Sequence, residues 1–286
     1  MLKTNKDKLI VISVIGQIAS PTRRQNYRLN HQGEATVFPG TGGITYNVKV
    51  GDPVFGWVGD HIEPGVSVKN KDENENRALN LYSCIGNKAY VLTGEAKGSI
   101  GVVTGKHGGI EHILIWFPDR VIEKLTIGDT IQIRACGQGL QVINLPEVKF
   151  FSIDPNLLIK INPQLKNGYL EFPVAHIIPP VLMGSGLGSE TAASGDYDIT
   201  TQDYNMIKTL KLESLRFGDL VYLADTDNTY GRCYKQGAAS VGVVVHSDCI
   251  IAGHGPGVTT IATSATGKIR PKLNKNANIA YYLNLR

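Results

Sequence analysis

The sequence has no apolar stretch long enough to cross a membrane. Its apolar N-terminal segment, residues 9–15, is far shorter than the roughly 20 residues that a membrane helix needs. The segment also lacks the small-residue cleavage site that follows the apolar part of a secretory signal. We therefore expect a cytoplasmic protein without membrane contact, in which residues 9–15 form the first β-strand.

Cysteine is scarce, and the cysteines do not form pairs in the sequence. The four residues are far apart: Cys84, Cys136, Cys233 and Cys249. A zinc ribbon or a redox dithiol needs a C-x-x-C pair, so this spacing argues against both. Without a secretory signal, buried and reduced thiols are favoured over two disulfides, which stay open as the alternative.

Neither sign of charge dominates the sequence. The chain has 29 Lys and Arg against 25 Asp and Glu, a net charge of +4, and the basic residues are scattered. Proteins that bind nucleic acid usually gather their basic residues in a patch or stripe. We therefore expect a small-molecule ligand and a homo-oligomer, with RNA as a less favoured partner.

Glycine, in contrast, is abundant, with 32 residues. Helices use glycine poorly, whereas the turns and bulges between strands need it. Apolar runs closed by glycine turns predict strands at residues 9–15, 44–50, 54–58, 89–92, 101–104, 112–117, 130–135, 220–224, 240–246 and 259–262. The predicted fold is mainly β with some α, with two β-barrel-like or sandwich-like subdomains and few short helices.

Changes in composition divide the chain. We predict an N-terminal β-rich domain at residues 1–145, a linker at 146–173, and a C-terminal β-rich domain at 174–286. Within the linker, Asp154 and Pro155 predict the cap and first turn of a short helix. Residues 69–77, KNKDENENR, are so polar that we expect an exposed loop.

The strongest functional motif follows the predicted strand at residues 240–246. His246 and Asp248 would share one face of an extended chain, and His254 follows in a glycine-rich turn. Imidazole and carboxylate groups so placed are typical of a divalent metal site, or of a general base with the group that orients it. The alternative is a histidine that only satisfies backbone carbonyls at a barrel rim.

Two further acidic pairs are candidates. Asp225 and Asp227 follow an apolar strand and resemble the start of a calcium loop, but the glycine and distal Glu of an EF-hand are absent. A plain turn between strands is an equally good interpretation of them. Asp196 and Asp198 follow the small-residue loop at 183–189, whose N–H groups could cradle an anion, although a mobile surface loop is favoured.

The N-terminal half offers a second contribution to a ligand site. Asp60 and His61 lie between glycines in a predicted turn, and Lys106 and His107 precede another glycine pair. A solvated turn is the alternative for the first pair.

Residues 93–103 resemble the KOW motif of small SH3-like barrels, through the spacing G-x-x-K-G-x-x-G-x-V. That resemblance implies a tight turn between two strands and contact with RNA or protein, although stacking aromatic residues are absent nearby.

Several stretches together resemble an uncharacterised prokaryotic family that has a domain-of-unknown-function label and is known mainly from a structural-genomics structure of a hyperthermophile member. The stretches are residues 43–48, 59–61, 104–109, 183–186, 196–198 and 253–257. The resemblance spans nearly the whole chain but implies no activity. Residues 218–221, followed by His246 and Asp248, are also similar to acetamidase/formamidase-type amide hydrolases, a likeness at the level of fold.

These observations favour an enzyme acting on a small polar molecule by metal-assisted hydrolysis of an amide or related bond. His246, His254, Asp225 and Asp227 are the expected catalytic groups. His246, Asp248 and His254 are the expected ligands of Zn²⁺, Mg²⁺ or Mn²⁺. Asp60, His61, Asp196, Asp198, Lys106 and His107 are expected to bind the ligand, the first two from the other domain or a neighbouring subunit. The alternatives are a non-catalytic ligand- or RNA-binding β-barrel protein, and an oligomer whose glycine–acid turns form no site.

Overall fold

The N-terminal half forms a closed β-barrel. In the computed structural model, which describes residues 2–22 and 25–285, six antiparallel strands close on themselves through pairing of the first with the last. In barrel order they are β1 (Ile12–Ile18), β9 (Thr130–Ala135), β6 (Lys88–Val91), β7 (Ile100–His107), β8 (His112–Trp116) and β5 (Gly65–Lys69). The short β4 (Ile44–Thr45) extends β5. The barrel interior is filled by Val, Ile, Leu and Phe side chains, as the alternation along each strand predicts.

The C-terminal half is built on a second, open sheet. Its strands in order are β10 (Lys149–Phe150), β17 (Gly257–Ser264), β16 (Cys233–Val244), β15 (Leu220–Asp227) and β13 (His176–Ile178), and β14 (Tyr197–Asp198) pairs with β17. A smaller sheet contains β11 (Gln164–Lys166), β12 (Tyr169–Val174) and β18 (Ile269–Leu273). The hairpin of β2 (Arg28–Leu29) and β3 (Ala35–Thr36) stands apart.

Helices are short and peripheral. They are α1 (Glu73–Tyr82), α2 (Asp119–Ile122), α3 (Pro155–Ile161), α4 (Tyr204–Thr209) and α5 (Ile279–Leu283), with single 3₁₀ turns at Lys6–Lys8, Pro180–Leu182 and Leu212–Ser214. None of the helices in the described ranges is long and apolar enough to cross a membrane. The predicted fold class, mainly β with few short helices, is confirmed.

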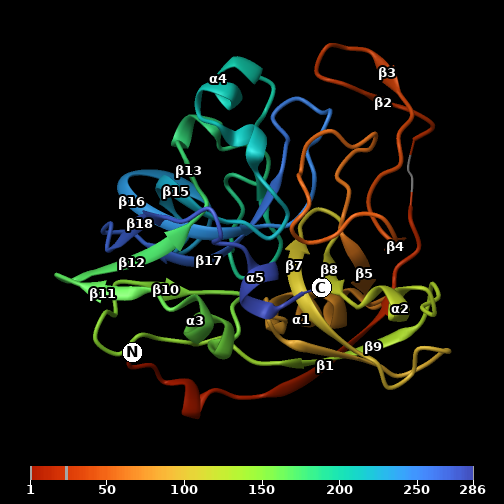
Figure 1. Ribbon diagram of the computed structural model, residues 1–286, viewed down its shortest axis with the longest axis horizontal. Helices are drawn as coiled ribbons and strands as arrows, with labels where there is room; N and C mark the ends of the chain where they lie inside the picture. The colour runs from red at the N-terminus through yellow and green to blue at the C-terminus, as the bar shows by residue number, and fades with distance from the viewer. Residues whose placement is uncertain (1, 23–24, 286) are drawn as a thin grey trace.

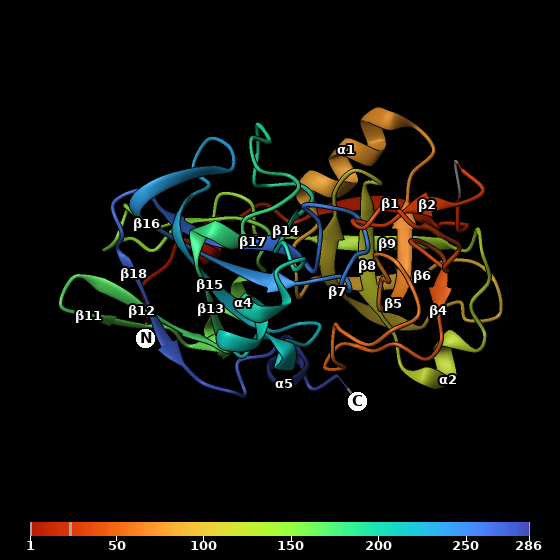
Figure 2. The same ribbon diagram turned by 90° about the horizontal axis from the view of Figure 1, so that it is seen from above.

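The two halves lie side by side and meet where β7 approaches β17 (Figures 1 and 2). The hydroxyl of Thr259 on β17 accepts from the Lys106 backbone N–H at 3.1 Å and donates to the Lys106 carbonyl at 2.9 Å. Beside this link, Gly105 faces Val245 so closely that a Cβ on Gly105 would overlap the valine side chain. His246 follows Val245 directly, and His107 follows Gly105 after one residue, Lys106. The contact between Gly105 and Val245 therefore positions one histidine of each half at the junction.

Local predictions hold best where a cap or a turn decides the structure. The helix α3 begins where expected, because the Asp154 side chain accepts from the Asn156 N–H at 2.7 Å. The KOW-like stretch forms the hairpin between β6 and β7. The helix α5 is also capped locally, with Asn278 as its N-cap. Within the predicted linker, β10, α3, β11 and β12 form, and their apolar side chains enter the core of the C-terminal half.

Several other local predictions are wrong. The polar stretch at residues 69–77 begins the helix α1, because Asp72 caps the N–H groups of Asn74 and Glu75. Buried polar side chains then help to hold this helix: Asn76 and Asn80 donate to the Glu111 carbonyl, and Leu79 between them packs into the barrel core. Residues 54–58 form turns instead of a strand, and only Ile44–Thr45 of the strand predicted at 44–50 is extended.

The thiol prediction holds in part. All four cysteines are free, in agreement with the preference for thiols over disulfides. Cys84 and Cys249 are buried, whereas Cys136 is half-buried and Cys233 is exposed at the start of β16.

Replacement of Gly105 by alanine should destabilise the contact between the halves. Because its Cβ would overlap Val245, we expect Gly105→Ala to lower the free energy of unfolding by about 1–3 kcal/mol, measured by urea denaturation. In a Val245→Ala background the same change should cost little, since the smaller side chain leaves room. Gly40→Ala is the matched control, because its Cβ would meet only the Asp60 carbonyl, at 3.4 Å. Equal stability of Gly105→Ala and Gly40→Ala would contradict this account.

Candidate metal centre

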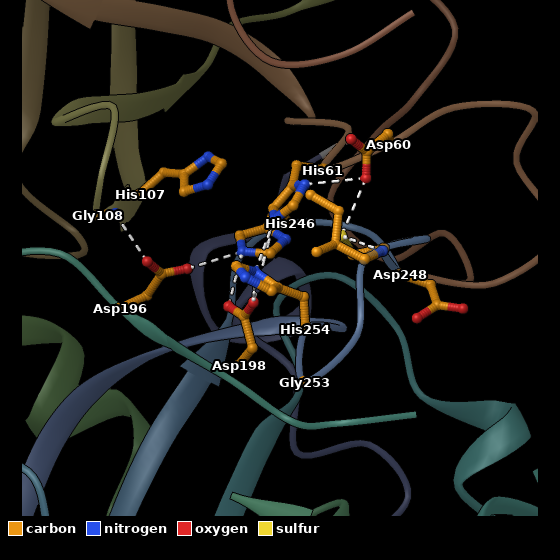
Figure 3. Close-up of polar contacts among 12 residues, drawn as sticks. Asp60, His61, His107, Gly108, Asp196, Asp198, His246, Asp248, Gly253 and His254 are labelled. Carbon is orange, nitrogen blue, oxygen red and sulfur yellow. Dashed lines mark hydrogen bonds and ion pairs between the residues drawn. The ribbon is translucent and has the colours of Figure 1, made fainter. Parts of the chain in front are cut away.

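Five of the seven histidines gather at the junction between the two halves. His61, His107 and His112 come from the N-terminal half, and His246 and His254 come from the C-terminal half. The rings of His107 and His246 stack with their centroids 4.3 Å apart, and the His61 ring lies 5.0 Å from that of His246. Figure 3 shows His61, His107, His246 and His254 with Asp196 and Asp198 among them.

His61 is held by a buried carboxylate. It has a positive φ of 53°, in a turn that places its Nδ1 3.0 Å from Asp60 Oδ1. Asp60 in turn binds the Arg28 guanidinium at 2.7 Å and accepts from the Cys249 thiol at 3.0 Å. Burial alone would raise the pKa of Asp60, but its hydrogen bond and its charge interaction with His61, with help from Cys249 and Arg28, lower it well below the usual range. Since an ionised carboxylate only accepts, Nδ1 of His61 carries the proton and Nε2 keeps its lone pair.

His107, at the end of β7, is held in the same way. Its Nδ1 lies 2.5 Å from Glu63 Oε1, and the same carboxylate accepts from His112 Nδ1 at 3.0 Å and from the Ser67 hydroxyl. Glu63 is buried, yet the charge and hydrogen bonds of His107 and His112 outweigh desolvation and hold the pKa of Glu63 well below its ordinary value. Nε2 of His107 is therefore left free to bind elsewhere.

His246 lies two residues beyond the end of β16 and is fully buried. Its Nδ1 donates to the Ser247 carbonyl at 2.9 Å. Its Nε2 lies 3.0 Å from Asp196 Oδ2 and 3.3 Å from Asp198 Oδ1. Burial lowers the pKa of His246, but the two carboxylates outweigh burial and raise it well above its ordinary value. This ion pair is not aligned as a hydrogen bond, and neither His246 Nε2 nor Asp196 Oδ2 has another hydrogen-bond partner among the described residues.

The three imidazoles thus share one arrangement, in which Nδ1 is bound by an outer acceptor; Nε2 of His246, whose pKa is raised, would have to lose its proton to bind a cation. One nitrogen each of His61, His107 and His246 lies within 4.8 Å of the other two. Outer acceptors that fix the tautomer and orientation of an imidazole are a regular feature of metal-binding histidines. Burial also lowers the pKa of His61, with the nearby His246 and His107 acting in the same direction, and this favours the neutral form that binds metal.

Asp196 and Asp198 complete a second, overlapping set of donors with His246. They come from β14 and the residues just before it, which pair with β17. The Gly108 N–H donates to Asp196 Oδ1 at 2.7 Å, which leaves Oδ2 facing His246. Asp198 Oδ2 lies 2.8 Å from His254 Nδ1 and also has no aligned hydrogen-bond partner in the described ranges.

His254 connects the cluster to solvent. Its side chain is 29 % exposed, its Nδ1 lies 3.3 Å from His61 Nε2, and with His61 and Cys249 it forms a third set of close donors. The cluster opens into a cavity of about 800 Å³, lined by His61, His107, Asp196, Asp198 and His254 together with residues of several glycine-rich loops. The donors are therefore buried on one side and reachable on the other.

Gly257 lets two of these donors pack against the backbone. A Cβ at this position would overlap both Asp196 Oδ2 and His246 Nε2. The backbone of Gly257 has no positive φ, so the conformation itself does not require glycine. The requirement is for the close approach of the two donor atoms, which a side chain would push apart.

The structure brings together seven of the predicted site residues and leaves four outside. Asp60, His61, His107, Asp196, Asp198, His246 and His254 meet in the cluster, all within one chain. Asp225 accepts from the Gly237 N–H, and Asp227 from Thr229, so both serve turns of the β15–β16 hairpin. Asp248 binds the Thr201 hydroxyl at 2.5 Å and points away from the histidines (Figure 3).

Lys106 also lies outside the cluster. It is fully buried, with Nζ 2.5 Å from the Ala193 carbonyl, and burial lowers its pKa to about 8. It therefore supports the loop that precedes Asp196 and presents no charge to an RNA. Asp219, from the stretch similar to amide hydrolases, is likewise buried away from the histidines, bound by Arg216 and Asn278.

Several residues of the site had no predicted role. Glu63 lay in the glycine-flanked stretch that contains Asp60, but its pairing with His107 and His112 depends on contacts between strands distant in sequence. Cys249 and Arg28, which both bind Asp60, carried no sequence signal. The pairing of His246 with Asp248 assumed an extended chain, but β16 ends at Val244.

Two family models match the chain in succession. Both are described as a domain of unknown function, DUF4438: the N-terminal model matches residues 27–159 and the C-terminal model matches residues 159–283. The chain belongs to the DUF4438 family. This membership confirms the resemblance to an uncharacterised family and brings no activity with it.

A solved structure of a relative agrees with this family. The chain is similar to TM1086, a structural-genomics target from a thermophile, and the crystal structure of TM1086 is known. The comparison of the two structures gives a TM-score of 0.95 and 49% sequence identity. The similarity covers 98% of this chain and 99% of that chain. No curated protein matches the chain.

Substitution of Gly257 by alanine should disrupt the donor set while leaving the fold intact. We expect Gly257→Ala to weaken binding of Zn²⁺ or Mn²⁺ by at least about tenfold, because the new methyl group occupies the space beside His246 Nε2. Isothermal titration calorimetry measures the affinity, and circular dichroism checks the fold. Gly40→Ala is the control and should bind as the unaltered protein does. Unchanged affinity in Gly257→Ala would show that the cation lies elsewhere.

Proposed function

We propose that this protein is a metal-dependent hydrolase that acts on a small polar molecule, with a divalent cation held between the two halves. One observation carries the proposal: three buried imidazoles have Nδ1 bound to outer acceptors, one nitrogen of each lies within 4.8 Å of the others, and His246 Nε2 faces two carboxylates. Without a cation, the buried Asp196 Oδ2, Asp198 Oδ2 and His246 Nε2 have no aligned partner in the part of the chain that the structure describes. Buried polar atoms are normally hydrogen-bonded, and a cation is one group that could satisfy three unpaired donor atoms lying together.

The donor types favour a transition metal over Mg²⁺. Imidazole nitrogens suit Zn²⁺ and similar ions, whereas Mg²⁺ prefers oxygen donors and retained waters. The cluster contains imidazole nitrogens from His61, His107 and His246. It also contains carboxylate oxygens from Asp196 and Asp198. Zn²⁺ is thus the first candidate and Mn²⁺ the second.

The open side of the cluster fits hydrolysis. A divalent cation there would polarise a substrate carbonyl and lower the pKa of a bound water. His254 is the partly exposed imidazole of the cluster, and its Nδ1 faces Asp198 Oδ2 at 2.8 Å. This carboxylate–imidazole pair is suited to accept a proton from the attacking water and to hold it near the leaving group. An amide or related bond in the cavity would be the point of attack.

Metal binding is the first test. Protein stripped with a chelator and then given Zn²⁺ at 100 times its Kd should gain about 2.7 kcal/mol of stability, seen as a rise in Tm. His246→Asn should abolish this rise, because it removes a central donor. His31→Asn, at an exposed histidine outside the cluster, is the matched control and should leave it unchanged.

The affinity should also fall as the pH is lowered, because protonated imidazoles cannot bind a cation, and the raised pKa of His246 makes this fall begin above the pH range in which an ordinary imidazole titrates. Elemental analysis of the purified protein gives an independent reading of the bound metal. A stripped protein that gains no stability from any of Zn²⁺, Mn²⁺ or Mg²⁺ would refute the metal centre.

Hydrolysis is the second test. Metal-loaded protein should release ammonia or amine from members of a panel of small amides, and the chelated protein should not. Asp198→Asn should lower the rate by about 100-fold or more, because it removes the partner of both His246 and His254. Asp227→Asn changes a carboxylate at the distant hairpin and should have little effect. Release of product at equal rates with and without metal would contradict the proposed chemistry.

A further inference from the structure

One wall of the cavity carries a buried arginine without an acidic partner. Arg232 directly precedes β16, is 4 % exposed and lines the same cavity as Asp196, Asp198 and His254. Its Nη2 donates to the Ser194 carbonyl at 2.9 Å, and its guanidinium lies over the Tyr197 ring at 5.4 Å. Its Nε has no hydrogen-bond partner within residues 2–22 and 25–285.

This arrangement is unusual for a buried charge. Buried guanidinium groups are normally paired with carboxylates, because desolvation of an unpaired charge is costly. No carboxylate lies within ion-pair distance of Arg232 among the described residues, and neutral carbonyl and ring contacts replace it. A second buried cation, Lys106, is also held by a carbonyl of this loop, that of Ala193.

The backbone on both sides of Arg232 is fixed. Its N–H donates to the Ser189 carbonyl at 3.0 Å, and its own carbonyl accepts from the Gly188 N–H at 2.7 Å. Gly231, just before it, packs against the Ser189 carbonyl so closely that a Cβ would not fit. The guanidinium is therefore held in place at the cavity wall before any ligand arrives, which reduces the entropy lost on binding.

The charges of the residues that line the cavity also favour an anionic ligand. A divalent cation would offset the charges of Asp196 and Asp198, and Arg28 is already paired with Asp60. Of the remaining charged lining residues, Glu111 can balance one of Lys69 and Arg232, and Lys69 donates only to the Ile110 carbonyl at 2.7 Å. With metal bound, the cavity wall has positive charge in excess.

We infer that Arg232 binds an oxyanion group of the substrate, a carboxylate or a phosphate, next to the metal centre. The inference rests on the proposed function and narrows its substrate class: the molecule to be cleaved has an anionic group at one end and the amide or related bond at the other. Arg232, which lines the cavity, would fix the anionic end through its guanidinium and so direct the scissile bond toward the histidines. A planar guanidinium suits this task, because its parallel N–H groups match the oxygens of such anions.

The experiment compares anion binding with metal binding in the same protein. Zn²⁺-loaded unaltered protein is titrated with inorganic phosphate and with malonate, and acetamide serves as the neutral probe. We expect at least one anion to bind, and Arg232→Gln to weaken it by about 10- to 100-fold. Arg232→Lys keeps the charge and loses the planar pair of donors. Its affinity for the anion should lie between that of the unaltered protein and that of Arg232→Gln. Arg134→Gln, at an exposed arginine on the barrel, is the matched control and should change nothing.

The two proposals fail separately. Zn²⁺ affinity should be equal within about threefold in Arg232→Gln and in the unaltered protein, since Arg232 donates no metal ligand. Anions that bind no better than acetamide to the unaltered protein overturn the inference whatever the variants do, even if Zn²⁺ binds. If the unaltered protein does not bind Zn²⁺ but binds an anion in a way that depends on Arg232, the proposed metal centre is overturned and the anion site is not.

Discussion

The close approach of β7 to β17 is the contact on which the site depends. Thr259 binds both backbone groups of Lys106, and Gly105 leaves just enough room for Val245. His107 and His246 follow these contacts directly in their own segments, so their rings stack at 4.3 Å as a consequence. The barrel contributes His61 and His107, and the second sheet contributes His246, Asp196 and Asp198. The set of three histidines therefore exists only when the halves are joined, whereas the set of Asp196, Asp198 and His246 lies within the C-terminal half.

The same region concentrates buried charge that a purely structural core would avoid. Glu63, Asp60 and Asp198 are buried carboxylates, and each keeps its pKa below the ordinary range because imidazoles surround it. Burial of charge costs free energy unless hydrogen bonds compensate, and Glu63 and Asp60 are compensated in this way. Asp196 Oδ2, Asp198 Oδ2 and His246 Nε2 form ion pairs but have no aligned hydrogen bond in the described ranges. These three atoms lie on the inner side of the cluster, whereas Glu63 and Asp60 lie behind the histidines.

Part of this site was readable in the sequence because glycine and polar residues occur together along it. His61, His107 and His254 each lie within two residues of a glycine, and all three line the cavity. Asp196 and Asp198 were found in the same way, next to the small-residue loop. The association of glycine with polar residues gave a wrong prediction for Asp225 and Asp227, because turn residues that only satisfy nearby backbone groups have the same composition. It also failed for Asp248, since the chain leaves the strand before His246 and no longer alternates its faces.

The sequence by itself determined the strand-rich class, the hairpin between β6 and β7, and the helix capped at Asp154, because these depend on turns, caps and alternation between near neighbours. It also determined which side chains could serve as donors. Only the tertiary structure decided which donors meet, that Glu63 rather than Asp248 supports the histidines, and that Lys106 is buried while Arg232 reaches the cavity. Those outcomes depend on contacts between residues more than 40 positions apart, such as Glu63 with His107 and Asp60 with Cys249, and no local pattern encodes them.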